Sequence, residues 1–391
     1  MRLFVLLSRF PYPLEKGDKL RAFHQLRVLS QHHEVLLCAL HENDLEESWI
    51  TEVKKYCSEL ETIRISRGRQ IVNLALSVFG NDPFQVSYFF QKHAKKRIDR
   101  LLSDWKPDAI YCQLLRTAKY VEEIGDIPKV IDFQDAFSKG IERRLNTDPW
   151  YYRPVLVSEL KRLNRYEQSV FTSFDHCTII SEQDRDQLPF EQRNNVTIVR
   201  NGVDLESFSP DSEEKSIEVL FAGNMGYPPN VEGAVFLHHE VMPLVRKHIP
   251  EAKLMLAGAR PAQQVKDLSD SNTTVTGWVD DIRDCYAQAK VFVAPMMIGT
   301  GLQNKLLEAM AMQIPCITSK LANNALQAKE GEEILIAKNA EEYAHLIVDL
   351  LQDPAKAETL GKSGFALVSN HYSWNGATQP LLDLLKRAAT S

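Results

Sequence analysis

Short apolar runs recur along the whole chain and alternate with stretches whose apolar residues have helical spacing. The runs are continuous instead of alternating apolar with polar residues, which is typical of strands buried on both faces of a parallel sheet. Since helices supply the crossovers between parallel strands, the pattern predicts an α/β fold. The strands expected in the first half are 3–7, 35–40, 62–65, 109–112, 129–133, 176–180 and 197–199.

The same rhythm begins again after Pro210, where the polar stretch 211–216 is expected to be a linker. The strands expected beyond it are 218–222, 253–257, 273–275, 291–294, 316–318 and 334–336. We expect two doubly wound domains, 1–205 and 206–372, and a helix over 373–391 that packs back on the first domain. Ligands bind beyond the carboxyl ends of the strands in such sheets, so the cleft between the domains is the expected active site.

Charge and cysteine usage exclude several classes of protein. The net charge of −6 argues against a nucleic-acid binder, which usually carries an excess of Lys and Arg. The six cysteines form no C-x-x-C metal or redox motif, and free thiols fit a reducing compartment. No run approaches the ~18 apolar residues of a membrane-spanning helix. We therefore expect a cytoplasmic protein.

The segment 291–319 has the features of an anion site. A strand is expected to end at Pro295, a turn follows at Gly299-Thr300-Gly301, and a helix is expected to begin near Gly301 or Leu302. Glycines let the backbone approach a ligand, and a helix N-terminus presents free N–H groups to an anion. Lys305 adds a cation for a diphosphate, and Glu308, on the same helix face, suits two ribose hydroxyls.

On spacing alone, a plain strand-turn-helix with a Lys305–Glu308 surface pair fits this segment equally well. Residue 304 is Asn, so the dinucleotide fingerprint G-x-G-x-x-G is absent, and the P-loop pattern is absent too.

The segment resembles the nucleotide-sugar signature of family 4 glycosyltransferases with the GT-B fold. It is most similar to the sugar transferases associated with exosortase (PEP-CTERM) and exopolysaccharide systems, in which G-x-G-x-Q-N-K-x-L-E-A-M-A recurs. The other matching stretches, in chain order, are F-P-Y-P-L-E-K-G-D-K-L-R-A-F-H (10–24), V-I-D-F-Q-D-A-F-S (130–138), R-Y-E (165–167), V-R-N-G-V-D (199–204), F-A-G-N-M-G-Y-P-P-N (221–230) and V-T-G-W-V-D-D-I (275–282).

The resemblance implies a GT-B enzyme of two Rossmann-like domains facing across a cleft. Such an enzyme moves a hexose, with retention, from a nucleotide-diphosphate sugar to an acceptor hydroxyl in surface polysaccharide or glycoconjugate synthesis. The implied partners are the nucleotide sugar and a glycan or lipid-linked acceptor, with no nucleic acid and no required cofactor. Two other functions stay open: a non-catalytic nucleotide- or glycan-binding relative, and a GT-B sugar-nucleotide epimerase.

The resemblance places the donor-binding residues mainly in the second domain. Glu308 matches the second Glu of the family's Glu-x7-Glu element, which holds the ribose. The first Glu, which contacts the sugar in retaining members, is replaced by Thr300, so sugar identity and stereochemistry stay open. We expect the backbone of Gly299-Thr300-Gly301 to bind the phosphates or the sugar instead.

Asn224 stands where many relatives have a diphosphate-binding Arg. That departure moves the cationic role to Lys305, with Arg200 as a second candidate that also fits a solvent-facing strand end. The remaining donor-binding residues that we expect from the resemblance are Gly223, Val279, Leu302 and Asn304.

Two first-domain residues are the catalytic candidates. Gly17 matches the family's glycine-containing loop after the first strand, although a helix-entry turn capped by Asp18 fits as well. Asp135 lies where family members usually have a His, and its carboxylate suits the acceptor hydroxyl's proton. Asp132 fits a cap or an ion pair at least as well as a catalytic role.

Three motifs that suggest a metal have simpler interpretations. Asp184 and Asp186 form a D-x-D string, but Ser181 and Asp184 have capping-box spacing. The pair Asp280-Asp281 is expected to cap a helix that begins at Ile282. His238 and His239 are adjacent in a helix and are expected to face apart. We therefore predict no metal.

The apolar stretch 71–90 is followed by the basic residues Lys92, His93, Lys95, Lys96, Arg97 and Arg100. This combination suits peripheral contact with the inner membrane surface beside a lipid-linked acceptor. An ordinary packed helix with a solvated charged face fits equally well.

Overall fold

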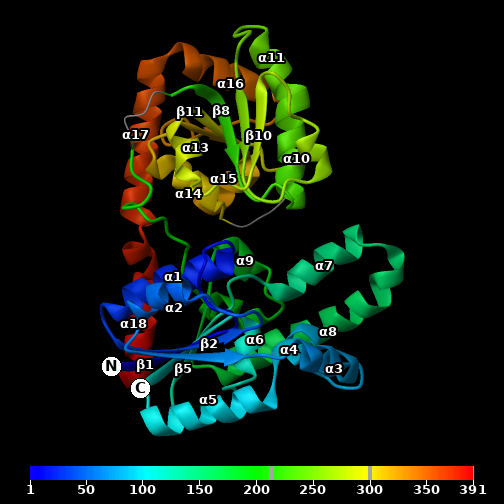
Figure 1. The fold of residues 1–391 in the computed structure, drawn as a ribbon, viewed down its shortest axis with the longest axis vertical. Helices are drawn as coiled ribbons and strands as arrows, with labels where there is room; N and C mark the ends of the chain where they lie inside the picture. The colour runs from blue at the N-terminus through cyan, green and yellow to red at the C-terminus, as the bar shows by residue number, and fades with distance from the viewer. Residues whose placement is uncertain (211–214, 298–301, 391) are drawn as a thin grey trace. The chain divides into compact units, whose positions relative to one another are not determined.

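The computed structural model describes residues 1–210, 215–297 and 302–390. They form two compact units, one of residues 1–200 with 378–391 and the other of residues 201–377 (Figure 1). These divisions lie five residues from the expected ones at each end of the second domain. Most of the expected linker and the Gly299-Thr300-Gly301 turn lie outside the described residues.

The first unit contains a parallel sheet of seven strands in the order β3-β2-β1-β4-β5-β6-β7. Its strands are β1 (Arg2–Leu7), β2 (Glu34–His41), β3 (Glu59–Arg64), β4 (Ala109–Gln113), β5 (Lys129–Asp132), β6 (His176–Ile179) and β7 (Thr197–Ile198). Leu3 and Phe4 point to opposite faces of β1, and both are fully buried. Helices therefore cover both faces, as the continuous apolar runs indicate.

The second unit contains a parallel sheet of six strands in the order β10-β9-β8-β11-β12-β13. Its strands are β8 (Ile217–Ala222), β9 (Leu254–Ala257), β10 (Thr273–Gly277), β11 (Ala289–Ala294), β12 (Cys316–Thr318) and β13 (Leu335–Ile336). In both sheets the strand order reverses beside the first strand of the unit. This switch point is where open α/β sheets bind ligands.

Helices connect the strands in both units. In the first unit they are α1 (Gly17–Ser30), α2 (Glu47–Lys54), α3 (Arg67–Ser77), α4 (Phe84–Phe89), α5 (Lys92–Trp105), α6 (Leu115–Ala118), α7 (Phe137–Thr147), η1 (Trp150–Tyr152), α8 (Arg153–Ser173), α9 (Glu182–Asp186) and η2 (Glu191–Asn195). In the second unit they are α10 (Pro228–Phe236), η3 (Leu237–Val241), α11 (Met242–Arg246), α12 (Gln263–Lys266), α13 (Arg283–Ala287), α14 (Asn304–Ala311), α15 (Lys320–Leu326), α16 (Ala340–Gln352) and α17 (Pro354–His371). The last helix, α18 (Trp374–Thr390), begins in the second unit, and its residues from 378 onward belong to the first.

The prediction of an α/β fold with two parallel sheets is confirmed. Every expected strand is present, with shifts only at the ends. The expected start of the helix in segment 291–319 was wrong, because Gln303 has extended backbone (φ −90°, ψ 99°) and α14 begins at Asn304. No described helix is both long and apolar enough to cross a membrane.

Candidate functional site

Glu308 occupies the middle of α14, where it faces the buried Tyr286 of α13. The Tyr286 hydroxyl donates a hydrogen bond of 2.8 Å to Oε2 of Glu308. Burial raises the pKa of Glu308, while the Tyr286 hydroxyl and the nearby Lys305 oppose the rise. The tyrosine thus fixes one carboxylate oxygen and leaves the other for a ligand's hydroxyl groups.

Lys305, one residue into α14, has mainly uncharged neighbours. Its Nζ lies 2.5 Å from Oδ1 of Asn230 and 3.5 Å from Sδ of Met296. The ammonium also lies 4.8 Å from the ring centre of Phe221. Burial lowers the pKa of Lys305 to about 7, and the Glu308 carboxylate opposes this shift. A bound diphosphate would favour the protonated form, because an anion compensates the desolvation of the cation.

Two glycines bring the ends of β8 and β9 together beside Lys305. A Cβ on Gly258 would lie 1.9 Å from the carbonyl oxygen of Gly223. A Cβ on Gly223 would lie 2.8 Å from Nδ2 of Asn230 and 3.4 Å from Nζ of Lys305. Only glycine allows this close approach. Asn224 is exposed, its Oδ1 accepts from the Gly226 N–H, and its carbonyl accepts from Asn230.

The other expected donor-binding residues fall in three groups. Asn304 accepts a hydrogen bond of 3.2 Å from Asn201, whereas Leu302 and Val279 are half-buried and pack on the core of the second unit. Arg200 belongs to the first unit, where its guanidinium lies 3.6 Å from Glu182. Gly299, Thr300 and Gly301 lie outside the described residues.

Asp132, at the end of β5, belongs to a buried structural network. Its Oδ2 accepts from Nε of the fully buried Arg21 at 2.6 Å, and its Oδ1 accepts from the Thr178 hydroxyl at 3.0 Å. Arg21 also donates to the carbonyl of Val199 at 2.8 Å. Asp132 is therefore the ion-pair partner that its position in the strand allows.

Asp135 has a different environment. Gln134 has a left-handed backbone (φ 62°), which turns the chain beyond β5, and the Asp135 side chain reaches solvent. Desolvation by the surrounding protein, together with repulsion from the carboxylates of Asp184 and Asp132, nevertheless raises the pKa of Asp135 to about 6. An exposed carboxylate whose pKa lies close to neutrality has the properties that a general base requires.

Gly17 begins α1, and a Cβ there would meet no atom within 4 Å. The alternative interpretation, a helix entry capped by Asp18, is right about the helix entry and wrong about the cap. The N-cap is Lys16, and the Asp18 carboxylate instead accepts a hydrogen bond of 2.6 Å from Arg9. The open space at Gly17 leaves room for a ligand beside this ion pair.

The capping interpretation of the D-x-D string is confirmed, because the Ser181 hydroxyl accepts from the Asp184 N–H at 3.1 Å. Asp281 accepts from the Arg283 N–H at 2.9 Å, where α13 begins. The expectation that His238 and His239 face apart was wrong: their ring centres lie 4.7 Å apart in the π-helical segment η3. No group of three or more metal-ligating side chains occurs among the described residues.

Two residues that contact Lys305 and Glu308 were not singled out in the sequence: Asn230 of α10 and Tyr286 of α13. Asn230 is the last residue of the matching stretch 221–230, and this position is the sequence signal that could have identified it. In the sequence, Tyr286 looks like an ordinary core residue of a helix, and no neighbouring residue indicates its hydrogen bond to Glu308.

Residues 216–353, which lie within the second unit, match the family model described as Glycosyl transferases group 1. Glu308, Lys305 and Asn230 all lie inside this matched range.

One relative matches nearly the whole chain. The chain is 22% identical to an uncharacterized 44.6 kDa protein in the cps region of Klebsiella pneumoniae, over 95% of this chain and 96% of that protein.

Solved structures share the GT-B fold of two Rossmann-like domains. Sucrose-phosphate synthase from Thermosynechococcus elongatus has a TM-score of 0.71 at 16% identity and covers both chains fully. Anabaena HepE, solved in complex with UDP and glucose, has a TM-score of 0.68 at 12% identity over 98% of this chain and 99% of that one. The predicted fold class is thereby confirmed.

Proposed function

We propose that the protein is a glycosyltransferase that moves a sugar from a nucleotide-diphosphate sugar to an acceptor hydroxyl. The observation that carries the proposal is the arrangement of Glu308, Lys305 and Gly223 within the second unit. It offers a carboxylate for ribose, a cation for diphosphate and a backbone that a ligand can approach closely. HepE, which has the same fold and was solved with UDP and glucose, supports this donor class.

The finer assignments extend this proposal. The donor sugar is a hexose, the chemistry is the retaining type of family 4, and Asp135 is the base that receives the acceptor's proton. The product enters a surface polysaccharide of the kind made by exosortase-associated exopolysaccharide systems. The cps-region relative supports a role in surface polysaccharide. The reaction takes place in the cytoplasm and requires no metal or other cofactor.

The second part of the proposal is contact with an anionic bilayer through α3 and the loop after it, which we call the α3 surface. Its exposed apolar side chains are Ile71, Val72, Leu74, Leu76, Val78 and Phe79. Arg162 of α8 donates to the carbonyls of Ser77 and Asp82 at 2.6 and 3.0 Å, so the backbone of the loop that carries Phe79 is anchored to the first unit. Phe79 itself is 91% exposed.

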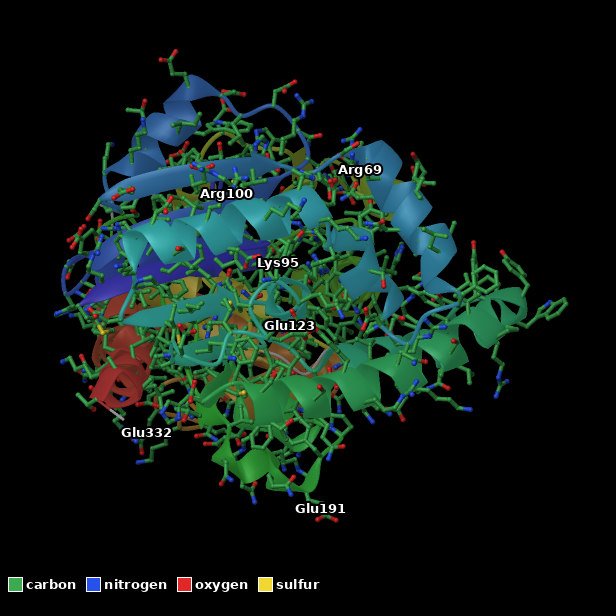
Figure 2. The ribbon with its side chains drawn as sticks, turned by 90° about the horizontal axis from the view of Figure 1, so that it is seen from below. Arg69, Lys95, Arg100, Glu123, Glu191 and Glu332 are labelled. Atoms are coloured by element: carbon green, nitrogen blue, oxygen red, sulfur yellow. The ribbon has the colours of Figure 1, made fainter. Side chains whose placement is uncertain are left out.

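Basic residues accompany the α3 surface. Figure 2 shows Arg69 at the start of α3 and Lys95 and Arg100 on α5. Lys95 is ion-paired with Asp99, and Arg97 is ion-paired with Glu61. The basic side chains outside these two pairs, including Arg69 and Arg100, therefore provide the attraction to anionic lipid. A bilayer contact would bring a lipid-linked acceptor to the first unit.

A transfer assay tests the proposed reaction. The protein is incubated with a panel of nucleotide sugars, with and without oligosaccharide and lipid-linked acceptors, and products are assigned by NMR. The proposal expects acceptor-dependent transfer with one donor, and the anomeric configuration of the product tests retention. Conversion of a nucleotide sugar without acceptor would indicate an epimerase. Tight nucleotide binding without turnover would indicate a non-catalytic relative, which Thr300 in place of Glu makes the main alternative.

A further inference from the structure

Arg116 is a half-buried arginine, two of whose nitrogen atoms are buried without hydrogen bonds. It lies in α6, directly after the carboxyl end of β4. In the part of the chain that the structure describes, its Nε and Nη1 are inaccessible to solvent and have no hydrogen-bond partner. Burying a cation without hydrogen bonds is costly, so side chains of this type are normally paired. An unpaired one at the ligand-binding end of a sheet points to a ligand.

The groups around Arg116 compensate its charge only in part. The guanidinium carbon lies 4.6 Å from the ring centre of Phe89 and 5.6 Å from that of Phe137. Aromatic faces attract a cation weakly and provide no hydrogen-bond acceptor in the guanidinium plane. Burial and the neighbouring Arg9 lower the pKa of Arg116 to about 10, so the group remains charged at neutral pH.

The nearest carboxylates are already engaged. Asp18 and Glu42 are the acidic groups that act on Arg116. Asp18 accepts from Arg9 at 2.6 Å, and Glu42 accepts from Nε2 of Gln70 at 3.0 Å. Neither carboxylate therefore pairs with Arg116, whose planar guanidinium is suited to a further planar or tetrahedral anion.

The position of Arg116 connects it with the catalytic candidates of the first unit. Phe137, on which it packs, begins α7 two residues after Asp135. Arg9 and Asp18 flank the loop that leads to Gly17. Figure 1 shows α4 and α6 close together at one end of the first sheet. The loops after β1, β4 and β5 therefore lie at the same edge of the first sheet.

We propose that Arg116 binds an anionic group of the acceptor, either the carboxylate of a uronic acid or a phosphate. This inference rests on the proposed function, in which this edge of the first sheet is the acceptor side of the transferase. The acceptor would then carry a negatively charged group close to the hydroxyl that receives the sugar. An uncharged acceptor would leave the guanidinium buried and unpaired in the complex.

Thermal unfolding with small acceptor fragments tests the assignment. The probes are methyl glucuronide for the carboxylate, glycerol phosphate for the phosphate and methyl glucoside as the uncharged control. We expect one of the two anions to raise the unfolding temperature and the glucoside to leave it unchanged. In Arg116→Met the effective anion should bind at least about tenfold more weakly, because a charged pair of hydrogen bonds is lost.

Further variants separate ligand binding from a structural role. Arg116→Met should itself unfold at the same or a higher temperature without ligand, because it removes an unpaired buried charge. Arg153→Gln removes an exposed arginine of the same unit and should leave the anion effect intact. Arg116→Lys keeps the positive charge but lacks the planar guanidinium with its parallel N–H donors. We therefore expect the anion to raise its unfolding temperature by an amount between those of the wild type and Arg116→Met.

Three results would overturn the assignment. The first is that neither anion stabilises the protein. The second is that an anion stabilises the wild type and Arg116→Met equally, which would indicate an adventitious ion only, and the third is that Arg116→Met unfolds at a lower temperature while its anion binding is unchanged. The nucleotide response is measured on the same samples. If it is absent while the anion effect depends on Arg116, the donor proposal fails and the anion site stands.

Discussion

At the residue scale, Lys305 and Glu308 illustrate why a spacing does not define a site. Their separation of three residues fits either a surface ion pair or two ligand-binding groups. The structure gives them different partners, Asn230 for the lysine and Tyr286 for the glutamate. Those partners lie 75 and 22 residues away in sequence, so no local pattern could reveal them.

The low pKa of Lys305 predicts that donor affinity depends on pH. A diphosphate binds best to the protonated lysine, whose pKa in the free protein is about 7. The bound anion raises that pKa, so the dissociation constant of the nucleotide sugar should increase about tenfold from pH 6 to pH 8. Calorimetric titration with an intact nucleotide sugar measures it, because its diphosphate does not titrate in this range. Lys305→Met should bind more weakly and without this pH dependence; an unchanged profile in the variant would contradict the assignment.

Asp135 leads to a second pH prediction. A general base works when deprotonated, and its pKa is raised to about 6, so the transfer rate should rise with pH through about 6 and be lost below it. Asp135→Asn should lower the rate by about 10²–10⁴-fold and leave nucleotide affinity unchanged. Initial rates and nucleotide titrations on both proteins test this. Full activity of the variant would remove Asp135 from the reaction.

At the element scale, the continuous apolar runs predicted the strands well, because burial on both faces imposes them directly. Helix ends were harder to predict. Asp18 looks like an N-cap in sequence, but in the folded protein Arg9 binds it, and Lys16 becomes the N-cap. Nothing in the sequence distinguishes Arg116 from other charged residues, because the rings that it contacts, Phe89 and Phe137, belong to other helices. Site geometry depends on such long-range contacts, which the sequence does not display.

The junction of β8 and β9 offers a stability test. Gly258→Ala should lower the free energy of unfolding by ~2 kcal/mol or more, because its Cβ would lie 1.9 Å from the Gly223 carbonyl oxygen and its φ is +133°. Gly17→Ala is the matched control, since nothing lies within 4 Å of its Cβ. Denaturant unfolding of both variants measures the difference. Equal stabilities would show that the two strand ends do not approach closely.

At the scale of the whole molecule, the α3 surface predicts binding to anionic membranes. The protein should float with vesicles containing phosphatidylglycerol and not with phosphatidylcholine vesicles. The double variant Ile71→Ser/Phe79→Ser should lose most of this binding, because two strongly exposed apolar side chains are removed. Glu191→Ser, an exposed change elsewhere in the first unit, is the control. Undiminished flotation of the double variant would remove the α3 surface from membrane contact.

The central proposal is that the second unit binds a nucleotide diphosphate through Lys305 and Glu308. Thermal unfolding of the wild type and of Glu308→Gln with UDP, GDP, ADP, dTDP and CMP tests it most directly, with NAD as a control. Ligand at ~100 times its dissociation constant stabilises by ~2.7 kcal/mol, which moves the midpoint by a measurable amount. We expect one nucleoside diphosphate to raise the unfolding midpoint of the wild type and to raise that of Glu308→Gln clearly less. No shift with any of them at millimolar concentration, or an equal shift in the variant, would contradict it.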